Sequence, residues 1–199
     1  MKLQSQKEKG NTTKDRLKKQ KIGIVIKQDT LENQVNTSYL GIGSNLGNKK
    51  IYIEKAKYLL KNLNIHIVKS SSIYETPSWP NFILPKYYNV VIKIKTELNP
   101  QSLFVKIKEI EIKLGRAKSK KNSPRTCDID IIDFNGEIFD FKVNQQKLTI
   151  PHPRLIDRNF VLFPLFEIDK NWKHPQKKTK IIDLIDNLSM NSLRTIKQI

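Results

Sequence analysis

The sequence predicts an α+β fold of the ferredoxin-like type, with a β-α-β-β-α-β core. Two observations support this prediction. Two amphipathic helical segments stand among short segments that have the composition and alternation of strands. Their order along the chain is strand, helix, strand, strand, helix, strand. We therefore expect an antiparallel sheet with the helices packed on it, followed by a C-terminal extension.

The first strand and the first helix are expected between residues 39 and 63. Residues 39–43 are a short buried-strand candidate that ends in the turn Gly-Ser-Asn-Leu-Gly-Asn. Asn48, the last residue of this turn, is a suitable N-cap for a helix. The helix then shows one apolar stripe at helical spacing, made of Tyr52, Ala56, Leu59 and Leu63.

Two strands separated by a loop follow. Residues 65–74 have the composition of a strand, and residues 76–85 contain three prolines, which predict a loop. In residues 88–96, every second residue from Tyr88 to Ile94 is apolar or aromatic, whereas Lys93 and Lys95 face the other side. This alternation is typical of a strand with one buried face.

The second helix has clear start and stop signals. Asn99 is its expected N-cap and Pro100 its first residue, where a missing N–H costs nothing. Gly115 suits the position just after the last turn. The buried stripe of this helix is expected to consist of Leu103, Ile107, Ile110 and Leu114.

The last core strand is expected after a basic loop. Residues 116–125 form this loop, and residues 127–134 have the composition of a strand. The Asn135-Gly136 pair is a strong hairpin signal, so we expect residues 137–143 to return as a strand. Residues 148–199 should add a Pro-His-Pro loop, short helices and a tail.

The chain divides into three expected parts. Residues 1–37 hold nine Lys or Arg residues against four acidic residues and few apolar residues, which predicts a basic, disordered arm. Residues 38–170 are expected to form the folded domain. Residues 171–199 should pack on this domain or trail from it.

Composition narrows the class of protein. The net charge of +18 predicts an anionic partner, such as nucleotide phosphates, nucleic acid or an acidic membrane surface, although a lysine-rich coding bias accounts for it equally well. The single cysteine, Cys127, excludes an intramolecular disulfide and a Cys-rich metal site. The sequence has no long apolar run and no signal-peptide pattern at its start, so we expect a cytoplasmic protein with no membrane segment.

The sharpest local motif is Asp128-Ile-Asp130 on the last core strand. Side chains alternate along a strand, so both carboxylates face one side, about 6.6 Å apart along the backbone. Cys127, Ile129 and Ile131 then face the core. A divalent cation such as Mg²⁺ would relieve the repulsion between the carboxylates. A solvated strand face is the structural alternative, and it is favoured for an isolated Asp-x-Asp.

Cations just before this strand change that balance. Two arginines, Arg116 and Arg125, flank a lysine-rich loop that leads directly to Asp128. Phosphoryl transfer needs such cations beside metal-binding carboxylates, because they stabilise the charge of the transition state. Each arginine can grip a phosphate with two hydrogen bonds. The combination predicts a phosphate site, whereas a charge run alone would be a solvated loop.

Two further groups of residues are weaker candidates. His152 stands between two prolines on a rigid segment and could bind a nucleotide, with Arg158 nearby; a loop histidine bonded to backbone is the alternative. Asn89 offers a donor and an acceptor that suit the edge of a heterocycle, and nearby aromatic residues could sandwich a flat ligand or simply pack in the core. Glu111 has an ordinary alternative as a solvated helix position.

These pieces, in this order, resemble the 6-hydroxymethyl-7,8-dihydropterin pyrophosphokinase family. The resemblance covers about residues 38–170, and it is the joint order of the motifs that is specific. The matching stretches are Tyr39-Leu-Gly-Ile-Gly43-Ser-Asn-Leu-Gly47, Tyr74-Glu-Thr-Pro77, Tyr87-Tyr-Asn89, Glu111-Ile-Lys-Leu-Gly-Arg116, Pro124-Arg-Thr-Cys-Asp-Ile-Asp130-Ile, Pro151-His-Pro-Arg154, Arg158-Asn-Phe-Val-Leu and Pro164-Leu-Phe-Glu-Ile168.

The resemblance implies a ferredoxin-like fold, ATP as co-substrate, two Mg²⁺ ions, and transfer of a pyrophosphoryl group to a pterin alcohol with release of AMP in folate biosynthesis. It implies a monomer with no nucleic-acid partner. Asn122 stands where some members carry an aromatic residue, and Pro153 where some carry Tyr.

The resemblance also implies roles for individual residues. Asp128 and Asp130 would hold the metal ions, with Arg116 and Arg125 as catalytic partners. The implied ATP site consists of Glu111, Arg116, Arg125, Ile131, His152 and Arg158. The implied pterin site consists of Gly43, Thr76, Pro77, Trp79, Tyr87, Asn89 and Phe160.

Two rival functions stay open at this point. Ferredoxin-like sheets include RNA-recognition modules, and the charge fits RNA, but the expected Lys/Arg-Gly-Phe-like motif is absent from the sequence. Another Mg²⁺-dependent kinase or nucleotidyltransferase would release ADP or pyrophosphate instead of AMP. The sequence also lacks a P-loop, a Gly-x-Gly-x-x-Gly turn and a zinc motif.

Overall fold

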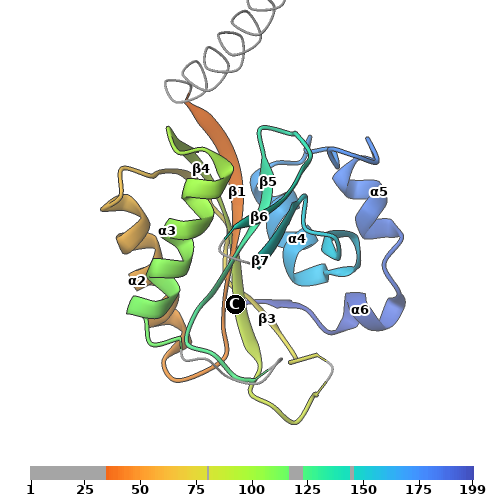
Figure 1. The fold of residues 1–199 in the computed structure, drawn as a ribbon. Helices are drawn as coiled ribbons and strands as arrows, with labels where there is room; N and C mark the ends of the chain where they lie inside the picture. Colours follow the sequence, from red (N-terminus) through yellow and green to blue (C-terminus); the bar gives the residue numbers. More distant parts are fainter. Residues whose placement is uncertain (1–34, 80, 117–122, 144–145) are drawn as a thin grey trace, which may run out of the picture. The chain divides into compact units, whose positions relative to one another are not determined.

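The structure is a computed structural model that describes residues 35–79, 81–116, 123–143 and 146–199 (Figure 1). Residues 1–34 of the arm expected at residues 1–37 lie outside the described residues. Its last residues already belong to the first strand, β1, which spans Asn36–Ser44 and begins two residues before the expected domain start.

An antiparallel sheet forms the centre of the domain. β1 lies between β5 (Asp128–Phe134) and β4 (Tyr87–Thr96), and both neighbours run antiparallel to it. β2 (His66–Ser70) and β3 (Tyr74–Thr76) both pair with β4, one after the other along its length. β8 (Lys197–Gln198) pairs with β3. The order is that of a ferredoxin-like fold, with the first strand of the core between the third and the fourth, so the predicted fold class is confirmed.

Two helices cover one face of this sheet. α2 spans Lys49–Lys61 and α3 spans Pro100–Lys113, and both lie on the same side in Figure 1. Their predicted caps are confirmed: the side chain of Asn48 accepts from the backbone of Ile51, and that of Asn99 accepts from Ser102. Gly115 ends α3 with a φ of +85°, a conformation that favours glycine.

The core between these helices and the sheet is aliphatic. Strand β4 contributes Val90, Ile92 and Ile94 to it, as the alternation predicts. The α3 stripe is buried as expected. The α2 stripe is shifted by one residue: Ile53, Ala56 and Leu60 are its buried residues, and the expected Tyr52, Leu59 and Leu63 pack at the margin.

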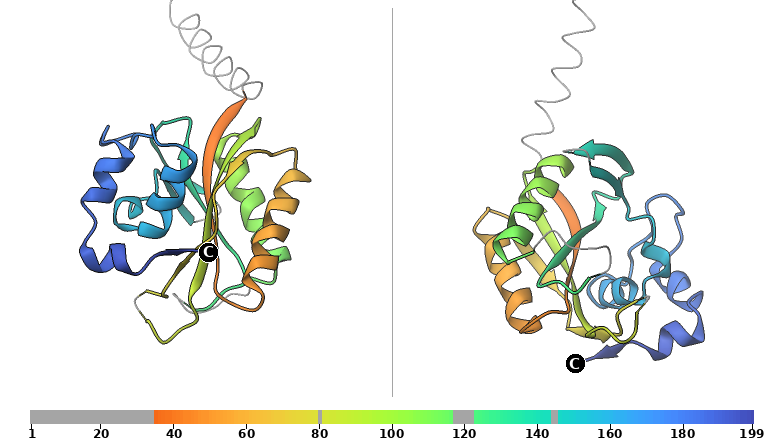
Figure 2. Two further views of the ribbon diagram at one scale, coloured as in Figure 1. Left: turned by 180° about the vertical axis from the view of Figure 1, so that it is seen from behind. Right: turned by 60° about the horizontal axis from the view of Figure 1, so that its bottom comes forward.

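The C-terminal extension covers the other face of the sheet. It holds a single 3₁₀ turn (Leu155–Asp157) and the helices α4 (Asn159–Ile168), α5 (Ile181–Asp186) and α6 (Met190–Arg194). In Figure 2, left, these helices lie opposite α2 and α3, so the sheet is the middle of three layers. A second apolar cluster joins this layer to the sheet through Tyr39, Val91 and Ile132.

Two strand predictions need correction. Residues 65–74 form two strands and not one. The backbone N–H of Ser71 still donates to the carbonyl of Val91, but the N–H of Val91 donates to the side-chain hydroxyl of Ser71, so the regular ladder is interrupted there. The Asn135-Gly136 turn exists, with positive φ at both residues, and residues 139–143 do form a strand, β6 (Phe139–Val143). However, β6 pairs with β7 (Gln146–Ile150) in a separate two-stranded sheet and not with β5.

No helix among the residues that the structure describes is both long and apolar enough to cross a membrane.

Candidate active site

Strand β5 presents two carboxylates on one face, as the alternation predicts. Asp128 and Asp130 are partly exposed, whereas Cys127, Ile129 and Ile131 are buried on the opposite side in the aliphatic core. Burial raises the pKa of the Cys127 thiol to about 12, so this cysteine is protonated and unreactive at neutral pH.

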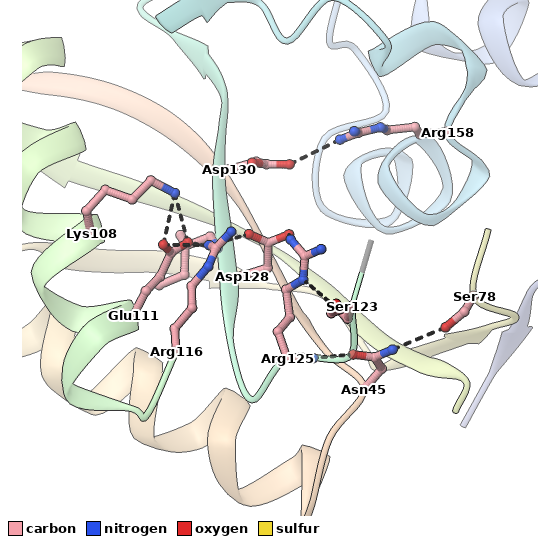
Figure 3. A network of polar contacts seen from close by, with 11 residues as sticks. Asn45, Ser78, Lys108, Glu111, Arg116, Ser123, Arg125, Asp128, Asp130 and Arg158 are labelled. Carbon is pink, nitrogen blue, oxygen red and sulfur yellow. Dashed lines mark hydrogen bonds and ion pairs between the residues drawn. The ribbon is translucent and has the colours of Figure 1, made fainter. Parts of the chain in front are cut away.

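Two arginines converge on Asp128 (Figure 3). Arg116, just after α3, places one guanidinium nitrogen 2.6 Å from Oδ1 of Asp128, and Arg125 places one 3.0 Å from Oδ2. Burial alone would lower the pKa of Arg116, but Asp128 and Glu111 raise it above its ordinary value. The arginine is therefore firmly charged. These two side chains offset the charge of Asp128 from either end of the loop that precedes β5.

Glu111 lies behind this pair. Its side chain is buried on α3 and accepts hydrogen bonds from the backbone N–H of Ile129 at 2.7 Å and from Lys108 at 2.9 and 3.0 Å. The nitrogen of Arg116 that contacts Asp128 also lies 2.6 Å from Oε2 of Glu111. The solvated alternative for Glu111 is therefore wrong. The signal was available, because Glu111 stands four residues after the buried Ile107 and on the same helix face.

Asp130 has its own cationic partner on the opposite layer. Arg158, at the start of α4, places a nitrogen 3.1 Å from Oδ2 of Asp130. Burial would raise the pKa of Asp130, but the positive charges of Arg158 and Lys108 hold it below its ordinary value, so the carboxylate is ionised. Burial lowers the pKa of His152, which favours its neutral form, and its Nδ1 accepts from the backbone N–H of Arg154.

The donor set fits a hard divalent cation that is shared with a ligand. Asp128 and Asp130 offer carboxylate oxygens, which Mg²⁺ prefers, on a partly exposed strand face. No group of three or more His, Cys, Asp or Glu side chains suited to a metal occurs among the described residues. Mg²⁺ commonly binds through one or two carboxylates together with phosphate oxygens, so two protein ligands are sufficient.

A wall of polar groups continues across the neighbouring strands. In the ladder, Asp128 is paired with Gly43 of β1, which is paired in turn with Asn89 of β4. Asn89 is buried and donates to the hydroxyl of Thr76 at 3.1 Å. A Cβ at position 43 would lie 3.1 Å from Oδ1 of Asn89 and 3.6 Å from the ring of Tyr87, so the glycine keeps this space open. Strands are about 4.8 Å apart, which places Asn89 about 10 Å from Asp128.

Asn45, whose role the sequence reasoning missed, connects the loops around this wall. Its side chain accepts from the backbone N–H of Arg125 at 2.8 Å and donates to the hydroxyl of Ser78 and the carbonyl of Pro85, both at 3.2 Å. Asn45 and Ser78 are buried, and Figure 3 shows the link between them. The loop that carries Arg125 is thus fixed to the loop that carries Pro77 and Trp79.

The structure brings most of the predicted site residues together and leaves a few apart. Phe160 lies beside Arg158, with the guanidinium carbon 5.5 Å from its ring centroid. Trp79 is 68% exposed, so its ring does not line the wall near Asn89. The side chain of Ile131 points into the core, which leaves only its backbone for a ligand. Asn122 and the lysines of the 117–122 segment lie outside the described residues.

Fold and site together define a class of protein: a ferredoxin-like α+β domain whose sheet presents two carboxylates, Asp128 and Asp130, that are ion-paired with arginines. The model of the family described as 7,8-dihydro-6-hydroxymethylpterin-pyrophosphokinase (HPPK) matches residues 39–170, which is most of the chain. The chain belongs to this pyrophosphokinase family of folate biosynthesis.

Curated relatives agree with this assignment. A 2-amino-4-hydroxy-6-hydroxymethyldihydropteridine pyrophosphokinase of Aquifex aeolicus is 41% identical over 139 residues, which cover 70% of this chain and 84% of the relative. The enzyme of the same name from Bacillus subtilis is 39% identical over 134 residues, 67% of this chain and 78% of the relative. The folic acid synthesis protein fol1 of Pneumocystis carinii is 32% identical over 83% of this chain, which matches only 22% of that longer protein.

A solved structure supports the fold. The crystal structure of wild-type Plasmodium falciparum HPPK-DHPS matches with a TM-score of 0.65 and 19% identity, covering 84% of this chain and 45% of that one. At this identity the likeness concerns the fold alone.

Proposed function

We propose that the chain transfers the pyrophosphoryl group of ATP to the hydroxymethyl group of 6-hydroxymethyl-7,8-dihydropterin, giving AMP and the pterin diphosphate ester. One observation supports this reaction most directly: in a single row of the sheet, Asp128 with its arginines lies two strands from the buried Asn89, with Gly43 between them. A phosphate site and a heterocycle site at this separation suit the transfer of a group between two bound substrates.

In this reaction the pterin hydroxyl oxygen forms a bond to the β-phosphorus of ATP. The bond between that phosphorus and the oxygen that bridges to the α-phosphate breaks, and this oxygen leaves with AMP. The hydroxyl proton is released, and we assign no protein general base to accept it. Positioning of the two substrates and stabilisation of the negative charge therefore account for most of the rate.

The arginines are proposed to bind the triphosphate. Arg116, Arg125 and Arg158 are ion-paired with Asp128 or Asp130 in the structure, and each has side-chain nitrogens within reach of the same open face. A bound triphosphate would compete with the carboxylates for these guanidinium groups. The carboxylates released in this way become available as ligands for cations.

Asp128 and Asp130 would hold two Mg²⁺ ions. Bound there, the ions would neutralise charge on the phosphate oxygens and orient the β-phosphorus. The chain's own contribution is to hold both carboxylates on one strand face, with Arg116 beside Asp128 and Arg158 beside Asp130.

Other residues are proposed to complete the ATP site. His152 lies within electrostatic range of Asp130 and offers a neutral imidazole to the nucleotide. Ile131 would contribute through its backbone. Glu111, which is buried, would act by holding Arg116 in place and not by direct contact with the nucleotide.

The pterin is proposed to bind against Asn89. The amide of Asn89 can bond to the edge of the heterocycle, and Gly43 and Thr76 leave the space beside it. Tyr87 lies half-buried at the same place, and Phe160 approaches from α4. Pro77 and Trp79 lie on the loop tied to Asn45, so this loop would have to bring the exposed indole to the ligand.

We further propose that the protein acts as a cytoplasmic monomer.

Product analysis tests the proposed reaction. Purified protein is mixed with ATP, Mg²⁺ and 6-hydroxymethyl-7,8-dihydropterin, and the nucleotides are separated. We expect AMP in amounts equal to the pterin diphosphate, with none formed when pterin or metal is omitted. ADP as the product would indicate a different kinase, and salt-sensitive RNA binding without pterin-dependent AMP would favour the binding module.

A further inference from the structure

Lys108 is a basic residue of α3 to which the proposed reaction gives no task. Its ammonium nitrogen lies 2.9 and 3.0 Å from the two carboxylate oxygens of Glu111 (Figure 3). The same nitrogen lies 5.3 Å from the ring centroid of Phe104, so the side chain is held between an aromatic ring and the carboxylate. The Lys108 side chain is 28% exposed, which leaves it partly screened from solvent.

Glu111 is a buried carboxylate that shares its charge with two cations. Its side chain is 2% exposed, and both Lys108 and Arg116 form ion pairs with it. The backbone N–H of Ile129 donates to it at 2.7 Å, which fixes the carboxylate against β5. A carboxylate in this position cannot lose all its cationic partners without a large cost, because a buried unpaired charge is strongly unfavourable.

Arg116, the second cation on Glu111, differs from Lys108 in that it also contacts Asp128. One of its nitrogens lies 2.6 Å from both Glu111 and Asp128, so two protein carboxylates hold the arginine at once. To bind a phosphate, Arg116 must weaken both contacts. The contact with Asp128 can be replaced by a cation from solvent, but the buried Glu111 needs a partner from the protein.

We propose that Lys108 is a positioning residue that keeps Glu111 neutralised, so that Arg116 can turn from the protein carboxylates to the nucleotide phosphates. The proposal rests on the proposed function only in that Arg116 binds phosphate. Lys108 then acts through Glu111 and Arg116 and makes no bond of its own to the nucleotide.

A double-mutant cycle on nucleotide binding tests this role. The probe is Mg²⁺ with an ATP analogue that has a methylene group between the α and β phosphates and cannot release AMP. Calorimetry measures its affinity for the wild type and for Lys108→Met, Glu111→Gln and the double variant. We expect Lys108→Met to weaken binding about tenfold, the equivalent of one charge-pair contact of about 1.4 kcal/mol. In the Glu111→Gln background the same change should have a much smaller effect, because the carboxylate that Lys108 contacts is gone and only its longer-range effect on Asp130 remains.

Two further variants separate charge from structure. Lys108→Arg keeps the ion pair and should restore most of the affinity. Lys106→Met is the matched control, because Lys106 pairs with Glu109 on the outer side of the same helix at 3.0 Å, away from the site. It should leave the affinity unchanged. If Glu111→Gln does not fold, Arg116→Met replaces it as the background, since no arginine then remains to be released.

The outcomes are distinct. A loss of the same size in the Glu111→Gln background means that Lys108 acts on the nucleotide or on Asp130 and not through Glu111, and it overturns the proposal. An unchanged affinity of Lys108→Met also overturns it. A wild type that binds the analogue but makes no pterin-dependent AMP contradicts the proposed reaction and leaves the binding cycle to decide on Lys108. A wild type that does not bind the analogue overturns both.

Discussion

The two faces of the central sheet present different kinds of side chain. The face under α2 and α3 is apolar from one end of the strands to the other, and its core positions on β4 follow the strand alternation. On β5, Ile129 and Ile131 follow it as well, and Phe134 departs from it beyond a register shift in the ladder with β1. The face under α4 changes character along the strands. Near Tyr39, Val91 and Ile132 it is apolar and covered, and near Asp128, Asp130 and Asn89 it is polar and partly open.

The difference shows what each face requires of the sequence. The closed face needs only apolar side chains at the right spacing, so many sequences satisfy it. The open face needs particular side chains on different strands at matching positions, because Asp128, Gly43 and Asn89 meet only through the register of the ladder. Substitutions on the open face should therefore change turnover or substrate binding, whereas substitutions on the closed face should change the free energy of unfolding.

Removal of a carboxylate on the open face should have the largest effect. We expect Asp130→Ala to lower kcat on the order of 10³-fold, because a ligand for the metal and the partner of Arg158 are lost together. The melting temperature should change little, since the side chain is partly exposed. Steady-state kinetics and calorimetry measure the two effects.

The matched control for this variant is Asp140→Ala on β6. Asp140 also forms an ion pair, with Lys147 at 3.1 Å, but it lies on the separate hairpin. Near-normal turnover of Asp130→Ala would contradict the metal assignment.

The second largest effect is expected from a cavity on the closed face. Such a cavity should lower the stability of the fold and leave the turnover of each folded molecule unchanged. Ile107 is fully buried on α3, so Ile107→Ala should lower the free energy of unfolding by about 2–5 kcal/mol through the lost burial and the cavity. Denaturant titration measures this loss. Ile112→Ala is the control, because Ile112 is 69% exposed on the same helix, and it should shift stability by about 0.5 kcal/mol or less.

A single methyl group placed at the boundary between the two halves of the open face should have a selective effect. Gly43→Ala puts a Cβ 3.1 Å from Oδ1 of Asn89. We expect the KM for pterin to rise about tenfold, while binding of the methylene ATP analogue stays the same. Gly41→Ala is the control, since its Cβ would meet only the end of the Ile132 side chain, at 3.3 Å. An equal loss of analogue binding would show that the two halves of the face are not separate.

The smallest effect concerns the covered part of the C-terminal layer and depends on pH. Nδ1 of His174 accepts from the backbone N–H groups of Gln176 and Lys177, both at 3.2 Å. Burial, together with the charge of Lys177, lowers the pKa of His174 below its ordinary value. The neutral form is favoured by folding, so its stabilisation is present above the unfolded pKa of about 6.5 and is lost as the pH falls through the lower folded pKa.

The measurement is the stability difference between the wild type and His174→Gln as a function of pH. It should be about 1 kcal/mol or less at pH 7.5 and should shrink as the solution is acidified. His66→Gln, which replaces an exposed histidine of β2, is measured alongside as the control. A difference for His174→Gln that grows on acidification would contradict the assignment.

Sequence reasoning succeeded where the signal is local. The caps at Asn48 and Asn99, the stripe of α3 and the alternation around Asp128 depend on residues within a few positions of each other, and the structure confirms them. The order of the elements was then enough for the fold class. The phosphate half of the candidate site could be predicted in the same way, because Arg116, Arg125 and Asp128 stand within one short stretch.

The errors arose where distant parts of the chain decide. The break in residues 65–74 depends on a bond from Val91 to Ser71, twenty positions away. The pairing of β6 is a different case, because β6 pairs with β7, the strand that directly follows it along the chain. The burial of Glu111 could have been inferred from its place on the α3 stripe. The link from Asn45 to Ser78 joins residues 33 positions apart and has no local signal.

The position of β1 has a consequence for how the chain folds. β1 is the first strand of the chain that the structure describes, and one of its two neighbours in the sheet is β5, far along the chain. The side chain of Ser38 on β1 donates to the carbonyl of Asp133 on β5, 95 positions later. Contacts of such long sequence separation slow folding, because a large loop must close before they form. β5 both closes the sheet and supplies Ile129 and Ile131 to the core. We therefore expect the Asp128 and Asp130 pair to reach its final geometry only at the last cooperative step, so that a partly folded chain does not expose an assembled metal site.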